Sequence, residues 1–495
     1  MTRQIFLAVD LGAESGRVMA GHWEGQSMAI EEVHRFSNGP IEIAGTHRWD
    51  VLRLWNEIQK GLALSGKKFG DAIRSVGVDA WGVDYALLSK SGELLGMPYC
   101  YRDSRTRGVM NRMFDRVPRD EIFAETGVQF MEINTLPQLW AANERNPEIL
   151  AVADCFLTIP DFVNWCLAGV RVCEFTNATT TQCLNAQTRG WATGMIEKLG
   201  LPTRMFPEVV PPGTKLGRLR DEVAGMTGLA NTSVVAPATH DTGSAVVGVP
   251  AEATGTTKWA YISSGTWSLM GLEAQQANLS RRAMELNVTN EGGVDGCYRL
   301  LKNITGMWLL QQCRKAFEDR GSRFEYGDLV ALAEKSESFR SLINPDAPAF
   351  LNPPDMPEAI RQFCLKTGQP APESAGAFAR CVLESLALKY AMVLGWLEEL
   401  SGDRVEVIHI VGGGSRNDLL NQFTANACQR TVLAGPVEAT TMGNLLMQAR
   451  AVGEIGSLAE LRRVVRQSAP VKRFEPEARS IASWSDAMER FRSLP

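Results

Sequence analysis

Two short segments rich in small and hydroxyl residues have the residue types needed to bind a polyphosphate. The first is Asp10-Leu11-Gly12-Ala13-Glu14-Ser15-Gly16-Arg17 and the second is Ser263-Ser264-Gly265-Thr266-Trp267-Ser268. Each lies between two apolar runs, which predicts a strand, a tight turn and a returning strand. Small residues let backbone N–H groups approach a bound anion closely. The repeated pattern predicts a duplicated nucleotide-binding fold with a cleft between its halves.

Two aspartates near predicted strand ends could take part in phosphate chemistry. Asp10 ends the first buried strand, where it could hold Mg²⁺ directly or through water. The alternative is that its carboxylate bonds only the amides of the turn. Asp241 follows a predicted strand at about 234–239 and could accept a hydroxyl proton. Because Asp is a favoured helix N-cap, a purely structural role is the alternative for Asp241.

Two further segments could contact the uncharged parts of a ligand. Gly412-Gly413-Gly414 lies between a predicted strand and a predicted helix and leaves room for adenine or ribose. The alternative is an ordinary tight turn. Trp81 could stack on a sugar and Asp84 could bond a hydroxyl group. The alternative there is a bulge with a buried tryptophan.

Composition and charge limit the classes of function. The 495 residues include 51 Lys and Arg and 56 Asp and Glu, and the net charge of −5 disfavours nucleic acid as a partner. The sequence contains neither a G-x-x-x-x-G-K-[ST] loop nor a C-x-x-C pair, so it predicts neither a Walker A site nor a zinc ribbon. We expect reduced, mostly buried cysteines, no membrane partner and a cytoplasmic location.

Strand and helix patterns mix throughout the chain, which predicts the α/β class. We expect strands at about 4–10, 15–23, 73–79, 258–272 and 285–301, and a helix capped by Asp50. We expect further helices over much of 105–168 and at 303–317, 374–400 and 482–492. Turn residues at 248–257 predict a boundary between an N-terminal domain, 1–247, and a C-terminal domain, 248–495.

Taken in order, the motifs resemble those of the FGGY family of carbohydrate kinases over nearly the whole chain. Within that family they are most similar to the members that phosphorylate L-rhamnulose. The segments that carry this resemblance are Val9–Ala13 with Ser15–Arg17, Trp81–Asp84, Tyr101–Thr106, Thr176–Gln182, His240–Thr242, Ser263–Gly271, Asn290–Gly293, Leu301–Ile304, Trp308–Gln311 and Gly435–Ala439.

The resemblance implies two actin-like, ribonuclease-H-like domains with ATP and a ketose in the cleft between them. It implies transfer of phosphate from ATP, with Mg²⁺, to O1 of L-rhamnulose in L-rhamnose degradation, with Asp241 as general base. By motif, the nucleotide-binding residues are Ala13, Glu14, Ser15, Gly16, Arg17, Thr266, Gln311 and Gly413. The substrate-binding residues are Gly82, His240, Asp241, Thr242 and Asn303. Glu14 replaces a serine that is common in the family, and we expect it to point outward.

Two alternatives remain open at this point. The first is a kinase for another ketose, L-fuculose or xylulose, because composition and spacing do not encode the stereochemistry of a sugar. The second is a non-catalytic, actin-like sugar sensor. A sensor has no need of a general base, so the presence of Asp241 favours the enzyme.

Overall fold

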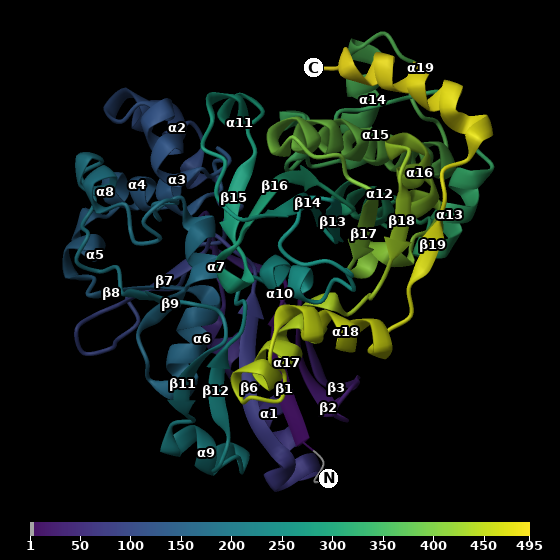
Figure 1. Cartoon of the computed structure of the whole chain (residues 1–495). Coiled ribbons are helices and arrows are strands. Elements are labelled where there is room, and N and C mark those ends of the chain that lie inside the picture. The colour runs from purple at the N-terminus through teal and green to yellow at the C-terminus, as the bar shows by residue number, and fades with distance from the viewer. Residues whose placement is uncertain (1–3) are drawn as a thin grey trace. The chain divides into compact units, whose positions relative to one another are not determined.

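The computed structural model describes residues 4–495, which form two compact units (Figure 1). Unit 1 consists of the described residues up to Gly255 together with Glu273–Leu300 and Ala439–Ala469. Unit 2 consists of Thr256–Leu272, Leu301–Glu438 and Pro470–Pro495. The chain therefore passes from one unit to the other several times. The boundary expected between residues 247 and 248 stays a prediction.

Unit 1 is built on a mixed sheet whose parallel strands end at one edge. The strand order is β11 (Thr214–Arg218), β12 (Ser233–Ala236), β6 (Ile73–Ala80), β1 (Gln4–Leu11), β2 (Ser15–Trp23) and β3 (Met28–Ser37). β1, β2 and β3 are successively antiparallel, whereas β6 is parallel to both β1 and β12. The carboxyl ends of β1, β6 and β12 therefore share one edge of the sheet, where ligands of α/β proteins commonly bind.

One face of this sheet is covered by two helices. Ile5, Leu7 and Val9 of β1 belong to a buried core with residues of α1 (Val51–Phe69) and α6 (Ile159–Ala168). Side chains alternate between the faces of a strand, so these three residues point the same way. Apolar residues recur along α1 at helical spacing, and this stripe is what anchors the helix to the sheet.

The opposite face of the sheet is covered by helices from much later in the chain. Phe6 and Ala8 join a second buried core with residues of α17 (Ala439–Ala451) and α18 (Leu458–Ser468). Asp10 continues the alternation of Phe6 and Ala8, so its carboxylate lies on the α17 face. A helix some 430 positions away in sequence therefore borders the first predicted turn.

Unit 2 repeats the strand plan of unit 1. The sheet that contains its strands has the order β15 (Thr289–Gly292), β16 (Tyr298–Thr305), β14 (Trp267–Ala274), β13 (Trp259–Ser264), β17 (Val407–Val411), β18 (Thr431–Ala434) and β19 (Lys472–Phe474). β13 and β14 form an antiparallel hairpin, β17 and β18 follow in parallel, and β19 is antiparallel. The order and directions match β2-β1-β6-β12-β11, which agrees with the expected duplication.

The remaining elements are helices and short strands, and six of these strands form three separate two-stranded sheets. In unit 1 they are β4 (Pro40–Ile43), β5 (Thr46–Trp49), η1 (Gly70–Ala72), β7 (Tyr85–Leu88), η2 (Ser104–Thr106), α2 (Val109–Arg116), α3 (Arg119–Thr126), α4 (Thr135–Arg145), α5 (Pro147–Val152), β8 (Cys155–Thr158), β9 (Val172–Glu174), α7 (Phe175–Ala178), η3 (Thr179–Thr181), α8 (Thr193–Lys198), β10 (Glu208–Val210), α9 (Asp221–Thr227), α10 (Asp241–Val247), α11 (Arg281–Glu285), β15 (Thr289–Gly292) and η4 (Val294–Gly296). In unit 2 they are α12 (Trp308–Asp319), α13 (Tyr326–Glu334), η5 (Pro348–Phe350), α14 (Met356–Lys366), α15 (Ala375–Ser401), η6 (Gly413–Arg416), α16 (Asp418–Cys428), η7 (Ala478–Ser480) and α19 (Ile481–Arg492).

Most of the expected elements are confirmed, and two are wrong. The side chain of Asp50 accepts a hydrogen bond from Arg53 N at 3.1 Å, so it caps α1 as expected. The helix expected from Asn303 begins only at Trp308, because the chain up to Thr305 is still strand β16. Within the stretch expected to be mostly helical, β8 pairs antiparallel with β7. Short strands of this kind carry no periodic signal of their own.

Two further expectations concern cysteines and membranes. All ten cysteines are unpaired thiols, and all except Cys166 are buried. Among residues 4–495, no helix has the length and apolar character required to cross a membrane.

Two glycines let α10 and α17 pack with their backbones in contact (Figure 1). A Cβ atom on Gly443 would lie 1.9 Å from the carbonyl oxygen of Ser244, and one on Gly248 would lie 2.2 Å from that of Ala439. Only glycine permits such an approach. The contact fixes the middle and the end of α10 against the helix that borders Asp10.

We expect Gly443→Ala to destabilise the protein by about 1–3 kcal/mol, because the added methyl group overpacks this contact. The matched control is Gly395→Ala in α15, where a Cβ atom meets nothing within 4 Å. There alanine should stabilise the exposed helix by about 0.5–1 kcal/mol. Urea unfolding of both variants measures the two changes. Equal effects of the same sign would contradict the packing argument.

Candidate active site

Asp10 and Asp79 lie side by side at the carboxyl ends of two parallel strands. They are register partners in the pairing of β1 with β6, so their side chains leave the sheet on the same face. Two side chains of α17 bond them: Thr441 Oγ1 donates to Asp10 Oδ2 at 3.1 Å, and Asn444 Nδ2 donates to Asp79 Oδ2 at 2.6 Å. Arg17, on the returning strand β2, forms an ion pair of 2.5 Å with Asp10.

Asp79 is buried and only half satisfied. Its Oδ1 is buried without a hydrogen-bond partner among the described residues. Burial raises the pKa of Asp79 well above its usual range, and the neighbouring charges of Asp10 and Asp241 raise it further. A buried carboxylate that lacks a partner and faces two like charges is a place where a cation or a proton is stabilised.

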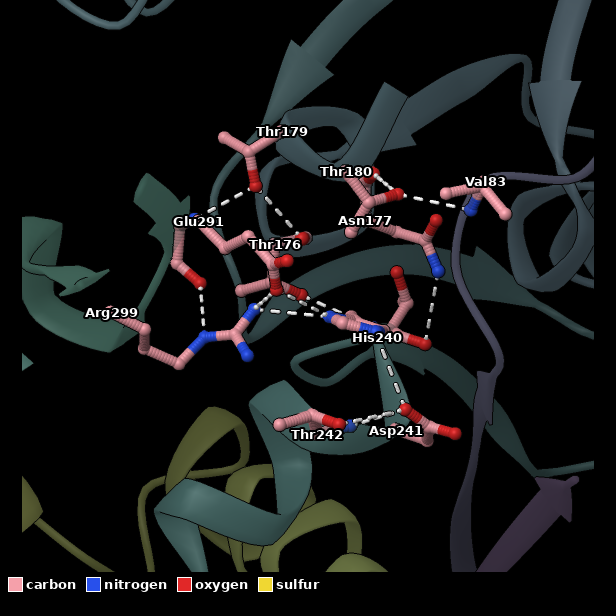
Figure 2. A network of polar contacts seen from close by, with 12 residues as sticks. Val83, Thr176, Asn177, Thr179, Thr180, His240, Asp241, Thr242, Glu291 and Arg299 are labelled. Carbon is pink, nitrogen blue, oxygen red and sulfur yellow. Dashed lines mark hydrogen bonds and ion pairs between the residues drawn. The ribbon is translucent and has the colours of Figure 1, made fainter. Parts of the chain in front are cut away.

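Asp241 is the first residue of α10, which follows β12. The N-cap position belongs to His240, whose side chain makes no capping bond, so the proposed N-cap role of Asp241 is wrong in the strict sense. Asp241 Oδ1 accepts from the backbone N–H of Thr242 at 2.5 Å and from its hydroxyl at 3.2 Å (Figure 2). The side chain keeps 34% of its surface exposed, so a ligand can reach its other oxygen.

Two opposing influences act on the acidity of Asp241. Loss of hydration raises the pKa of Asp241, and the charge of Asp10 raises it as well. The imidazole of His240 and the N–H of Thr242 act in the opposite direction. A carboxylate with a raised pKa is a stronger base than an ordinary aspartate, which suits it to accept a hydroxyl proton.

Asp10, Asp79 and Asp241 concentrate negative charge at one edge of unit 1. Within residues 4–495, no three His, Cys, Asp or Glu side chains are arranged to hold one metal ion directly. A divalent ion here therefore needs water or phosphate oxygens to complete its coordination, as is usual for Mg²⁺. The unsatisfied oxygen of Asp79 and the like charges around it fit such a partly hydrated ion.

Buried polar side chains contact the loop around Gly82 and hold it in place. A Cβ atom on Gly82 would lie 3.0 Å from Thr180 Oγ1, and the same oxygen accepts from Val83 N at 3.1 Å (Figure 2). Val83 has a φ of 67°, a left-handed conformation that is costly for a β-branched residue. Strain of this kind persists where the surroundings enforce it, often at ligand sites.

Trp81 and Asp84 support this loop from inside the protein. Trp81 is buried, and its ring lies 4.3 Å from that of Trp49. Asp84 Oδ2 accepts from both indoles and from Tyr101 N, and Oδ1 accepts from Gln138 Nε2. All these contacts are internal, so the structural alternative describes both residues. Burial nevertheless raises the pKa of Asp84 to about 6.

The first predicted phosphate turn joins β1 to β2. Gly12 N donates to Ser15 O at 2.8 Å, which closes the turn. Glu14 is exposed, as expected. Gly16 is required for packing, because a Cβ atom there would lie 2.2 Å from the ring of Phe36. Arg17 is paired with Asp10 and so brings a positive charge to the same edge.

In unit 2 the second turn packs against two other predicted nucleotide-binding segments. Gly306 N donates to Thr266 O at 3.2 Å, at the start of the segment that leads into α12 and Gln311. On the other side, a Cβ atom on Gly414 would lie 2.0 Å from Ser264 Oγ. The second turn, the segment that leads into α12 and the glycine run are therefore neighbours within one unit.

Two observations at this cluster suit a ligand. Gln311 Oε1 is buried without a partner among residues 4–495, so an acceptor is left available. Gly413 is exposed, and a Cβ atom there would meet nothing within 4 Å. The open space beside Gly413 is where a flat ring could lie against the backbone.

The predicted sugar-binding residues are divided between the units. Gly82, His240, Asp241 and Thr242 belong to unit 1. There Ala80 N donates to Thr239 O at 2.9 Å, which brings the Gly82 loop beside the start of α10. Asn303 belongs to unit 2, on β16.

Several polar residues that support this site were not predicted from the sequence. Glu174 accepts from the hydroxyl groups of Thr176 and Thr239, and Thr176 Oγ1 in turn accepts from His240 N at 3.2 Å (Figure 2). Burial raises the pKa of Glu174. In the sequence, the signal for these residues is the Thr-rich run 176–181. So many hydroxyl groups can be buried together only if they form hydrogen bonds. The signal for Asp79 was an aspartate that ends a buried strand, as Asp10 does.

Comparison with known proteins shows a match in both halves of the chain. The model of the N-terminal domain of the FGGY family of carbohydrate kinases matches residues 5–248, and that of the C-terminal domain matches residues 260–452. The chain is 45% identical to a protein named rhamnulokinase from Bacteroides thetaiotaomicron, over 99% of both chains. It is 44% identical to the rhamnulokinase of Pectobacterium atrosepticum, covering 99% of this chain and 96% of that one.

A solved structure shares the fold at low sequence identity. The xylulose kinase of Lactobacillus acidophilus is 16% identical to this chain, with a TM-score of 0.82, and the match covers 99% of this chain and 97% of that one. At this identity the likeness concerns the fold alone. It confirms the expected two-domain α/β fold of the sugar-kinase type.

We expect Asp79→Asn to raise the free energy of unfolding by about 1–3 kcal/mol at pH 8, because it removes a poorly paired buried charge. The pKa of Asp79 is higher in the folded than in the unfolded chain, so wild-type stability falls as pH rises from about 4 toward the raised pKa. The gain of the variant should therefore shrink on acidification. Urea unfolding between pH 4 and pH 8 measures it.

Asp71→Asn is the matched control, because Asp71 is exposed in η1. It should change stability by less than about 0.5 kcal/mol at either pH. Two results would contradict this account of Asp79. One is a lower free energy of unfolding for Asp79→Asn than for wild type, and the other is an increase in that free energy that does not depend on pH.

Proposed function

Because the chain belongs to the FGGY family of carbohydrate kinases, we propose that it transfers the terminal phosphoryl group of ATP to O1 of L-rhamnulose. The product is L-rhamnulose 1-phosphate, an intermediate of L-rhamnose degradation. The observation that carries this proposal is the full-length identity of 40–45% to relatives named rhamnulokinase. The alternatives of an L-fuculose or xylulose kinase and of a non-catalytic sensor have no comparable support.

Asp241 is proposed as the general base. The exposed oxygen of Asp241 takes the proton of the sugar O1 hydroxyl while the sugar O1 forms a bond to phosphorus. ADP leaves with the electron pair of the broken P–O bond. The raised pKa of Asp241 supports this role, because a stronger base shares the proton more effectively in the transition state. Thr242 holds the other carboxylate oxygen and so fixes the orientation of the base.

Gly82, His240, Asp241, Thr242 and Asn303 are proposed to bind the sugar. The support in unit 1 is the shared position of the first four, at the loop and helix start that follow β6 and β12. Gly82 leaves the space above Thr180 free of a side chain. The strained Val83 and the buried network below keep this loop rigid, which lowers the entropic cost of binding.

The nucleotide is proposed to bind Ala13, Glu14, Ser15, Gly16 and Arg17 through the first turn and Thr266, Gln311 and Gly413 through unit 2. Backbone N–H groups of both turns face phosphate oxygens in this proposal. Glu14 contributes its backbone, because its side chain is exposed. The unsatisfied oxygen of Gln311 accepts from the nucleoside, and Gly413 leaves room for it.

Mg²⁺ is the proposed metal, held near Asp10 directly or through water. When bound, it neutralises charge on the phosphates. Arg17 forms an ion pair with Asp10, and Thr441 donates a hydrogen bond to the same carboxylate. Asp79 places a second carboxyl group beside it. We also propose the division at residues 247 and 248 as the boundary of the two functional domains, and a cytoplasmic location.

An ADP-release assay against a panel of sugars tests the proposed function. With ATP and Mg²⁺, L-rhamnulose should give the highest kcat/KM in a panel with L-fuculose, L-ribulose, D-xylulose and glycerol. A strong preference for another ketose would leave a kinase with a different substrate. If no sugar stimulates ADP release, the kinase proposal itself fails.

A further inference from the structure

A chain of charged and polar side chains leads from the buried interior of unit 1 to the proposed base. It consists of Glu291, Arg299, His240 and Asp241 (Figure 2). Arg299 Nη2 lies 3.1 Å from His240 Nδ1 and 3.1 Å from Glu291 Oε2. His240 Nε2 lies 3.4 Å from Asp241 Oδ1. The Nδ1 atom of the imidazole ring therefore meets the Arg299 cation, and the Nε2 atom meets the proposed base.

Arg299 is rigidly held. Its side chain is completely buried on β16, and its Nε donates to Gly292 O at 2.8 Å. Together with the ion pair to Glu291, this leaves one orientation for Nη2, toward the imidazole ring. The backbone of His240 is fixed as well, because its N–H donates to Thr176 Oγ1.

The identity of these partners determines which ring nitrogen carries the proton. A guanidinium group only donates hydrogen bonds, so its contact with Nδ1 requires a lone pair there. The proton of the neutral ring is then on Nε2, where it faces the carboxylate of Asp241. With the proton on Nδ1, an N–H would face the Arg299 cation and a lone pair would face the Asp241 carboxylate. Both contacts would be repulsive.

Among residues 4–495, Glu291 is the competitor for the proton on Nδ1. Its Oε2 lies 3.2 Å from that nitrogen and could accept from it. The charged groups that face the ring are therefore Arg299 on β16, Glu291 on β15 and Asp241 on α10. Because Glu291 is already paired with Arg299, the arginine decides the direction of the hydrogen bonds.

We propose that Arg299 is a positioning residue: it holds His240 with its proton on Nε2, directed at Asp241 Oδ1, so that the exposed oxygen of Asp241 faces the substrate hydroxyl. This inference rests on the proposed function, in which Asp241 is the general base. The contact of 3.4 Å is long for a hydrogen bond, and such contacts shorten when a substrate closes the site. Orientation of a catalytic group by a hydrogen-bonded partner is a recurrent arrangement.

The direct test is ¹⁵N NMR of the imidazole nitrogens in the full-length protein labelled at histidine. The chain has five histidines, and His240→Gln assigns the signal. We expect an unprotonated Nδ1 and a protonated Nε2 for His240 at neutral pH, with no substrate needed. A proton on Nδ1, alone or together with one on Nε2, would overturn the proposal. This readout stands even if no ketose is phosphorylated, so it is separable from a failure of the proposed function.

Arg299→Lys tests the consequence for catalysis. The ammonium group keeps the charge but loses the planar fork that joins Gly292, Glu291 and His240. We expect kcat to fall about tenfold, the size expected for one hydrogen bond from a charged donor, with a smaller change in KM for the ketose. The His240 proton should move in part to Nδ1, toward Glu291. Unchanged kcat and an unchanged tautomer would refute the role of Arg299.

Arg462→Lys is the matched control. Arg462 is also fully buried in unit 1, where it is paired with a buried glutamate, Glu273, at 2.5 Å and donates to the carbonyl oxygen of Val246. It should lower thermal stability as much as Arg299→Lys while kcat and the His240 tautomer stay unchanged. If it lowers kcat equally, the effect of Arg299 is one of stability alone, and the proposal fails.

Glu291→Gln keeps the test decisive if Arg299→Lys does not fold. Gln can still accept from Arg299, so the proton should remain on Nε2. If the tautomer changes instead, the carboxylate of Glu291 sets the ring, and Arg299 does not.

Discussion

The concentration of negative charge at the edge of the first sheet is the constraint on which the rest of unit 1 depends. Asp10 and Asp79 end neighbouring parallel strands, and Asp241 follows the next one. Burial and the charge of Asp10 raise the pKa of Asp79 and of Asp241, so the fold must supply donors to keep these carboxyl groups there. Arg17 supplies a charge, and α17 supplies the side chains of Thr441 and Asn444.

This constraint gives α17 its unusual composition. Asn444 and Gln448 are buried, and they bond the sheet as well as each other. Gln448 Nε2 donates to Leu7 O at 2.8 Å, and Ser75 Oγ donates to Gln448 Oε1 at 2.7 Å. Polar groups buried in this way stabilise a fold only when they are satisfied, and they then fix one arrangement of helix and sheet. The glycine contact of α17 with α10 extends that rigidity to Asp241.

The duplicated strand plan explains how one architecture serves two chemical tasks. In unit 1 the parallel strands end in carboxylates, which suits proton and metal chemistry. At the corresponding edge of unit 2 the turn after β13 and the loop after β17 contain serine, threonine and glycine. Such residues expose backbone N–H groups and leave space for a nucleoside. The same fold thus separates the proposed base and metal residues from the proposed nucleoside-binding residues.

Local pattern was sufficient to predict the elements that bear on this site, and long-range pairing was not. The hairpins around residues 10–17 and 263–268 and the cap of α1 by Asp50 follow from alternation and turn chemistry. The strand β8 was missed because its pairing with β7 bridges a long sequence separation. Asn303 was assigned to a helix because apolar residues at 301–310 fit either period until the pairing of β16 is known.

The same limit applied to the candidate site. The residues next to Asp10 and Asp241 in the sequence indicate a role for these two aspartates. The roles of Asp79 and Arg299 can be inferred only from partners far along the chain. Trp81 and Asp84 showed the reverse: they looked like ligand contacts in the sequence but are bonded internally. Buried polar residues cannot be sorted into support and function until their partners are known.

The role of Asp241 as base is the central claim, and kcat of Asp241→Asn with L-rhamnulose tests it most directly. Asn can accept from Thr242 as Asp does, so a thermal melt should change little while the amide can no longer take a proton. The account predicts a fall in kcat of about 10²–10⁴-fold with ketose affinity much less affected. A variant that melts like wild type and retains near-wild-type kcat would contradict it.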